Sequence, residues 1–462
     1  MIYNSIPASN AMKISVNSKI TDKGFMTLVN SKRYETVYPR YVWNSVPKQQ
    51  RKDIAECCSY FVTRHLALLN NTITYDFPPP SQRLFFDYGL YYSLTEAPFE
   101  FPEKEFSTST IIKNIYNSEF HVQFNDIPNK YLSGKNIQLE KKSIVMPISF
   151  GKDSLLTYSI LRELKFDIHP FFFQEPHCPF QNAKKMILRR LFNNEFSTEI
   201  QLFPNALGTL RQKNDPMWGW DMLLTQYTAL LAPFVFYWKA SCFFWSNEQS
   251  TNENENNHEG YIVNPTHEQS VSWIIHLNNL FRMWSLNTHI GSLLEPLHEL
   301  IILYILHTRY PAIGKYQLSC DGEKTKNRWC GHCFECARVF LFLTALGIDP
   351  KRVGLMDDMF TEKKLSLFYL FSKSSGTNSL DIVFQSYSER LLAFYLVYKR
   401  GIRGYAVYMF KKKLLPYVLK HKRELYNKYF SLYPSRTIPN DIKPNILRIY
   451  QDELKHLKHN LL

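Results

Sequence analysis

The chain has 462 residues, of which 45% are apolar and 21% are charged, and its net charge is +14. This length is more than one hydrophobic core usually holds, so we expect two or three domains, and the composition excludes a disordered chain. The N-terminal residues lack the basic start and apolar stretch of a signal peptide, and the longest apolar run, Ala229–Trp238, is too short to cross a bilayer. We therefore expect a cytoplasmic protein with no membrane partner.

Residues 1–140 predict an N-terminal domain of mixed type. Gln49–Leu69 follows Pro47 and has the length of a helix, whereas Tyr75–Ser81 contains three consecutive prolines and predicts a connector. Arg83–Leu94 alternates aromatic and polar residues, which indicates a strand.

Residues 141–375 alternate strand and helix patterns, which is typical of a parallel sheet with helices on both faces. The predicted strands are Ser143–Ile148, Phe166–Phe173, Phe196–Phe203 and Ser241–Trp245. The predicted helices are Leu155–Leu164, Met186–Phe192, Met222–Trp238 and one that begins near Pro296 and stops at Tyr310. Residues 376–462 predict a helical, basic C-terminal region, because 15 Lys and Arg stand against 4 Asp and Glu from Lys399 onwards, a balance of +11.

The segment between the first strand and the first helix of this sheet has the composition of an anion-binding loop. It reads Ser149, Phe150, Gly151, Lys152, Asp153, Ser154. Backbone N–H groups at the start of a helix, together with the helix dipole, favour a phosphate there. Lys152 offers a counter-charge, and Asp153 suits a helix cap or a magnesium ion better than a phosphate. An ordinary capped turn fits these six residues equally well.

This loop resembles the Ser-Gly-Gly-x-Asp-Ser signature of the PP-loop ATP pyrophosphatases, with Phe150 in place of the first glycine. The resemblance implies an adenine nucleotide alpha hydrolase-like (HUP) fold, bound ATP and Mg²⁺, and cleavage of ATP between its α- and β-phosphates. A Walker A loop is excluded, because no GxxxxGK[ST] pattern is present.

Four cysteines fall within seventeen residues: Cys320, Cys330, Cys333 and Cys336. Their spacing supplies a tetrahedral set of thiolates, which predicts a closed structural Zn²⁺ site, with an iron–sulfur cluster as the alternative.

The loop, the Glu295–Leu300 segment and the cysteines together resemble the cyano-deazaguanine synthase (QueC) branch of these enzymes, which adenylates a carboxylate and converts it to a nitrile. A second resemblance is to the ATP-dependent epimerases of UDP-muramoyl-dipeptide (MurL), carried by Ser246–Ser250, by His267–Ser270 and by Arg328–Cys336. A third is to QueC-like proteins of antiphage systems, which attach a deazaguanine to a protein partner.

Several further residues are candidates for the site. Asn247 and Glu248 follow a predicted strand, where open α/β sheets bind ligands. His267 with Glu268 could form an acid/base pair, although such a dipeptide is more often structural. Further candidates near a ligand are Glu175, His177, Trp218 and Trp220.

The expected function is ATP-dependent adenylation of a small-molecule carboxylate. We assign catalysis to Lys152, Asp153, Glu248 and His267, and nucleotide binding to Ser149–Ser154 with Asn247. A nucleic-acid-modifying factor and a non-catalytic ATP-binding subunit are the alternatives. The lysines of the C-terminal region could bind nucleic acid, but a solvated helix face is the preferred interpretation. We expect that region to be dispensable for ATP cleavage.

Overall fold

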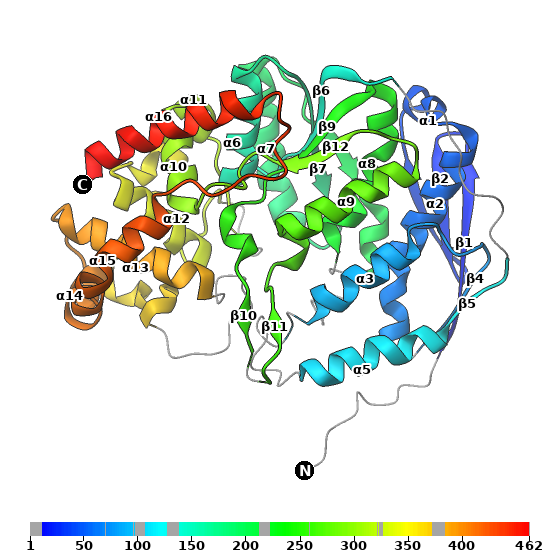
Figure 1. Ribbon diagram of the computed structural model, residues 1–462, viewed down its shortest axis with the longest axis horizontal. Helices are drawn as coiled ribbons and strands as arrows, with labels where there is room; N and C mark the ends of the chain where they lie inside the picture. Colours follow the sequence, from blue (N-terminus) through cyan, green and yellow to red (C-terminus); the bar gives the residue numbers. More distant parts are fainter. Residues whose placement is uncertain are drawn as a thin grey trace, which may run out of the picture.

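The computed structural model describes residues 12–69, 71–95, 97, 107–126, 138–211, 222–257, 259–320, 322, 327–371 and 384–461. Its centre is an α/β unit built on a five-stranded parallel sheet, and a second five-stranded sheet of mixed direction lies at one end of the molecule (Figure 1). Among the described residues no helix is long and apolar enough to span a bilayer.

The parallel sheet has the strand order β12-β9-β6-β7-β8. Its strands are β6 (Glu140–Pro147), β7 (Asp167–Gln174), β8 (Gln201–Pro204), β9 (Ala240–Trp245) and β12 (His289–Ser292), and every pairing is parallel. The chain runs outward from β6 through β7 to β8, then returns to the other side of β6 for β9 and β12. The strand order therefore reverses between β6 and β9, where such sheets form a ligand-binding crevice at their carboxyl ends.

Side chains alternate between the two faces of this sheet, as the two-residue period of a strand requires. In β6, Ile144 and Met146 join one hydrophobic core, whereas Val145 joins the other. The first core includes α6 (Lys152–Glu163), α7 (Pro179–Phe196) and α10 (Glu299–Thr308), and the second includes α8 (Leu223–Trp238) and α9 (Val271–Met283). Both faces are thus covered by helices, as the sequence predicts.

The N-terminal region extends the second core. Its sheet has the order β3-β2-β1-β4-β5, with β1 (Lys13–Thr21), β2 (Gly24–Val29), β3 (Lys32–Val37), β4 (Thr72–Tyr75) and β5 (Val122–Phe124). Its helices are α1 (Arg40–Ser45), α2 (Lys48–Thr63), α3 (Arg83–Leu94) and α5 (Thr108–Ser118). Both α1 and α2 pack on α8, and the buried Tyr38 hydroxyl donates to the Leu230 carbonyl of that helix at 2.9 Å.

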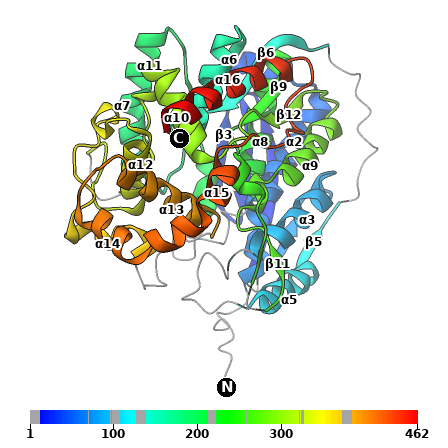
Figure 2. The ribbon, with the colours of Figure 1, turned by 60° about the vertical axis from the view of Figure 1, so that its left-hand side comes forward.

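The C-terminal helices extend the first core (Figure 2). They are α13 (Phe384–Lys399), α14 (Tyr405–Lys413), α15 (Leu415–Tyr429) and α16 (Lys443–Leu461), and α13 packs against α12 (Phe334–Leu346). Among the described residues there are also the short helix α11 (Pro311–Gly314), the two-residue strands β10 (Glu255–Asn256) and β11 (Ile262–Val263), and short 3-10 helices such as Arg64–Leu69.

Most predicted helices and strands of the central unit are confirmed. Three predictions are corrected: one element of the N-terminal region has a different type, and two elements of the central unit have different boundaries. Residues 83–94 form a helix, because the residues that are buried, among them Phe86, Leu90 and Leu94, repeat every four positions. The predicted strand 196–203 is limited to β8, since α7 continues to Phe196. The helix expected near Pro296 begins at Glu299, because Pro296 lies in a turn closed by the Leu297 N–H on the Leu294 carbonyl.

Candidate functional site

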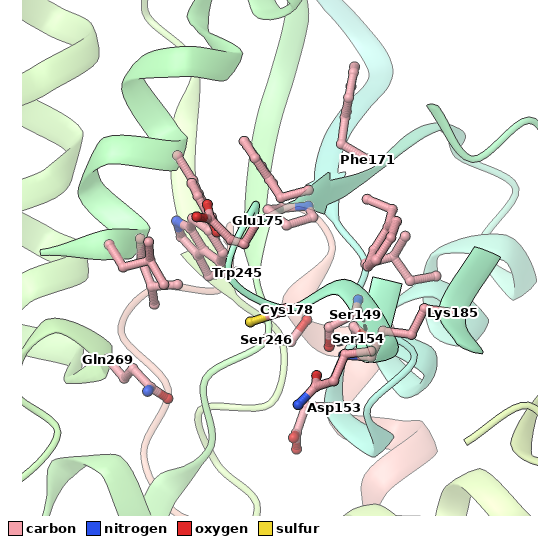
Figure 3. Close-up of a pocket in the computed structure, with 18 of the residues that line it drawn as sticks. Ser149, Asp153, Ser154, Phe171, Glu175, Cys178, Lys185, Trp245, Ser246 and Gln269 are labelled. Carbon is pink, nitrogen blue, oxygen red and sulfur yellow. Dashed lines mark hydrogen bonds between the residues drawn. The ribbon is translucent and has the colours of Figure 1, made fainter. Parts of the chain in front are cut away.

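A cavity of about 410 Å³ opens at the carboxyl ends of β6, β7 and β9 (Figure 3). Its wall combines residues of the loop before α6 with aromatic side chains from the strands and with the start of α8. The lining residues used below are Ser149, Asp153, Ser154, Glu175, Ser246 and Asn247. The cavity thus occupies the crevice where the strand order reverses, and its size is typical of a small-molecule site.

The loop between β6 and α6 contains a residue in a strained conformation. Phe150 has φ +62°, in the left-handed region that glycine adopts without penalty and other residues rarely enter. Its ring is fully buried and packs edge-on against Phe172 and Phe192, with ring centroids 6.4 and 6.0 Å away. Its carbonyl accepts the N–H of Leu318 at 2.8 Å. Core packing therefore holds Phe150 in a backbone conformation that favours glycine.

Two serines hold the two ends of this loop together. The Ser149 N–H donates to Ser154 Oγ at 3.2 Å, and the Gly151 N–H donates to Ser149 Oγ at 3.3 Å. Gly151 is the N-cap of α6, so the first N–H groups of that helix lie beside the cavity and have no partner within the helix. These donors and the dipole of α6 make the start of the helix suitable for an anion.

The sequence led us to expect Lys152 as a counter-charge to a phosphate, but in the structure its ammonium is paired with carboxylates. Its Nζ lies 2.9 Å from Asp153 Oδ2, 3.4 Å from Glu248 Oε2 and 3.8 Å from Glu299 Oε1. Burial acts to lower the pKa of Lys152, but the three carboxylates outweigh it and raise that pKa. Burial likewise raises the pKa of Asp153 and that of Glu248, against the opposing effect of Lys152. Lys152 is thus the charged centre of a carboxylate cluster.

Three members of this cluster were not predicted from the sequence: Glu299, Arg338 and Glu389. Arg338 Nη1 pairs with Glu299 Oε2 at 2.8 Å, and Arg338 Nη2 pairs with Glu335 Oε2 at 2.6 Å. Glu389 of α13 is 1% exposed and accepts the Leu300 N–H at 2.8 Å. Burial, followed by the charges of Glu299 and Glu248, raises the pKa of Glu389 well above its usual range.

The C-terminal region packs against the elements that carry the carboxylate cluster, and its dispensability for ATP cleavage stays a prediction. It supplies Glu389 and also closes over the residues that precede α10. The Glu295 carboxylate accepts the N–H groups of Arg436 and Thr437 at 2.7 and 2.8 Å. His298 packs edge-on against Tyr429 and Tyr433. Truncation before α13 would expose the first core.

The opposite wall of the cavity is built around Glu175. This carboxylate accepts hydrogen bonds from Tyr227 Oη and Asn205 Nδ2 at 2.6 Å each, and it pairs with the buried Arg211 at 2.5 Å.

Two polar side chains follow β9 at the cavity. Asn247 is 8% exposed, and in the described part of the chain neither its Nδ2 nor the Ser246 Oγ has a hydrogen-bond partner. Because buried polar groups are almost always satisfied, these two atoms are suited to a ligand.

The structure places His267 away from the carboxylate cluster. Its ring stacks on Tyr92 of α3 with centroids 4.9 Å apart, and burial lowers its pKa to about 4, so the imidazole is neutral at pH 7. The adjacent Glu268 accepts the Thr225 N–H at 2.6 Å near the start of α8, and burial raises its pKa to about 7. Trp218 and Trp220 lie outside the described residues.

The four predicted cysteines come together. The sulfur atoms of Cys320, Cys330, Cys333 and Cys336 all lie within 4.8 Å of one another. Backbone N–H groups point at them, including those of Cys330 to Cys320 Sγ at 3.2 Å and of Cys336 to Cys333 Sγ at 3.4 Å. This donor set could hold one tetrahedral metal ion such as zinc, whose Zn–S bonds are about 2.3 Å.

Comparisons with protein-family models, with curated proteins and with solved structures find no match for this chain.

Proposed function

We propose that this chain is a PP-loop adenylating enzyme, which uses ATP to activate a substrate carboxylate and releases AMP and pyrophosphate. The observation that carries the proposal is the position of the loop Ser149–Ser154 at the rim of the cavity, between the carboxyl end of β6 and the start of α6. In a phosphate-binding fold of this kind, the loop holds the phosphates and the crevice holds the nucleoside or the second substrate.

The conformation of Phe150 supports this proposal. The resemblance to the PP-loop signature is weakest at that position, where a glycine is expected. With φ +62°, Phe150 follows a backbone path open to glycine, so the substitution does not require a different loop. The ring adds to the core instead of to the cavity.

Asp153 and Glu248 would be the residues to hold a magnesium ion, and the ion would have to displace the Lys152 ammonium, because both Asp153 oxygens lie 2.9–3.0 Å from Lys152 Nζ. Their carboxylate oxygens are the ligands that Mg²⁺ prefers, and Glu248 Oε2 is buried with no hydrogen bond among the described residues, although Lys152 lies near it. Bound there, the ion would neutralise charge that develops on the phosphates.

The chain's own groups would have the following roles. The N–H groups at the start of α6 would stabilise the departing pyrophosphate. Lys152 would hold the carboxylates in place against one another until the metal ion binds. The unpartnered Asn247 amide and Ser246 hydroxyl would orient the substrate. We assign a structural zinc ion to the four cysteines, because all four positions of the tetrahedron are taken by protein ligands.

The test is to follow nucleotide products when ATP is supplied with a carboxylate. We expect AMP and pyrophosphate, and no ADP, with carboxy-deazaguanine plus ammonia or with UDP-muramoyl-Ala-Glu; the active substrate would also identify the branch. Asp153→Asn should lower the rate at least about tenfold. Asp452→Asn, an exposed change on α16, is the matched control and should leave the rate unchanged. ADP as the product, or AMP formed equally fast without a carboxylate, would refute adenylation.

A further inference from the structure

The helices α14 and α15 form a surface that the proposed chemistry does not use. They lie at the end of the molecule opposite the N-terminal sheet (Figure 1). Their apolar faces are buried: Ala406, Val407 and Phe410 in α14, and Val418 and Leu425 in α15. The solvent-exposed side chains of the two helices therefore do not contribute to the core.

This surface concentrates positive charge. Nine Lys and Arg, and no Asp or Glu, occur from Lys399 to Arg423, and the next residue, Glu424, lies 2.9 Å from His421 of the same helix. Lys411, Lys412 and Lys413 are exposed, and within the described residues none of them forms an ion pair with a carboxylate. Exposed lysines on a folded surface are usually interspersed with acids, so the uncompensated run Lys411–Lys413 indicates a polyanionic partner.

Aromatic rings lie among these charges. Tyr408 is 56% exposed, Tyr417 is 53% exposed, and Tyr405 is 36% exposed. Tyr405, Tyr408 and Lys412 are spaced by three and four residues and share one face of α14. The Tyr405 and Tyr408 rings are 6.3 Å apart, and Tyr405 also contacts the Glu362 carboxylate. An exposed ring beside exposed lysines can stack on a base while the lysines contact phosphates.

We propose that the exposed face of α14 and α15 binds single-stranded nucleic acid. Stacking on the tyrosines and ion pairing with the lysines would act on one strand together, with little dependence on base sequence. An anionic membrane would attract the same lysines, but helices that bind membranes insert an apolar face, and here that face is buried against α13.

The test measures binding of a fluorescein-labelled twenty-nucleotide oligo-uridine to the full chain by fluorescence anisotropy, at several salt concentrations. The triple substitution Lys411→Gln, Lys412→Gln, Lys413→Gln should weaken binding at least about tenfold and lower the slope of log K against log salt by about 2, which is three contacts at about 0.7 each. The triple substitution Lys13→Gln, Lys19→Gln, Lys32→Gln removes the same charge from the N-terminal sheet and should change binding less than about twofold.

The double substitution Tyr408→Ala, Tyr417→Ala separates stacking from charge. It should weaken binding by at least about fivefold and leave the salt slope unchanged. Thermal unfolding of each variant verifies that it is folded. The proposal is overturned if the native chain does not bind the oligonucleotide at 50 µM, if the N-terminal triple weakens binding as much as the α14 triple, or if the chain binds phosphatidylserine vesicles instead.

Discussion

The left-handed backbone of Phe150 can be tested by comparing the stability of its alanine and glycine variants, because the usual order, with alanine the more stable, should reverse there. Phe150→Ala and Phe150→Gly both remove the buried ring, and each should lower the free energy of unfolding by about 3–5 kcal/mol. The two differ in the backbone, because alanine keeps a Cβ at φ +62° and glycine does not. Left-handed backbone costs a residue with a Cβ about 1–2 kcal/mol, so the Gly variant should be more stable than the Ala variant by about 1 kcal/mol.

The assay is urea unfolding followed by tryptophan fluorescence, with the Ala and Gly variants compared under the same conditions. A matched pair at Tyr116, an exposed residue within α5, supplies the control. There the backbone is helical, so Gly should be less stable than Ala by about 1 kcal/mol. If Phe150→Ala is as stable as Phe150→Gly or more so, the loop does not have the left-handed conformation, and the argument for its glycine-like path is refuted.

Three further predictions concern buried carboxylates and the cysteines. Glu268→Gln should flatten the pH dependence of stability. In the unsubstituted chain the folded state keeps the Glu268 proton up to about pH 7, whereas the unfolded state loses it above about pH 4.5, so the free energy of unfolding falls by no more than about 3 kcal/mol as the pH rises from 5 to 8. Equal pH profiles of the two chains in urea unfolding would contradict this. Glu389→Ala leaves the Leu300 N–H unpaired and should lower the free energy of unfolding by about 1–3 kcal/mol. Glu389→Gln keeps an oxygen acceptor for that N–H and should lose less. Urea unfolding measures both variants, and equal losses would count against the hydrogen bond. Cys333→Ser should reduce bound zinc, measured by elemental mass spectrometry, from one ion per chain to nearly none, while Cys242→Ser keeps it; iron in the native chain would exclude zinc.

The sequence predicts the central part of this fold because its signals are local. An apolar run, a turn of small residues and an amphipathic segment identify β6, the loop and α6 without knowledge of the rest of the chain. The same reasoning failed at residues 83–94, where Tyr88 and Tyr92 are exposed on a helix and disguise its buried stripe. The cysteine cluster is likewise local, since its four residues fall within seventeen positions of the sequence.

The carboxylate cluster could be predicted only in part. Asp153 follows from the loop and Glu248 from its place after a strand. Glu299, Arg338 and Glu389 lie on three helices far apart in the sequence. Glu299 falls within the Glu295–Leu300 segment of the family resemblance, but nothing in that segment marks its side chain as a partner of Lys152. Only the packing of α10, α12 and α13 brings them toward Lys152, and no local pattern encodes that packing.

The parallel sheet depends on both ends of the chain for its cover, which matters during synthesis. Its last strand, β12, is complete at Ser292, and the N-terminal region can already close one face. The other face needs core residues as far as Leu457, which are 165 residues further along the chain (457 − 292). At about 5–20 residues per second, a ribosome takes about 8–33 s to supply them. During that interval the nascent chain exposes apolar surface, so a chaperone that binds such surface should associate with it until translation ends.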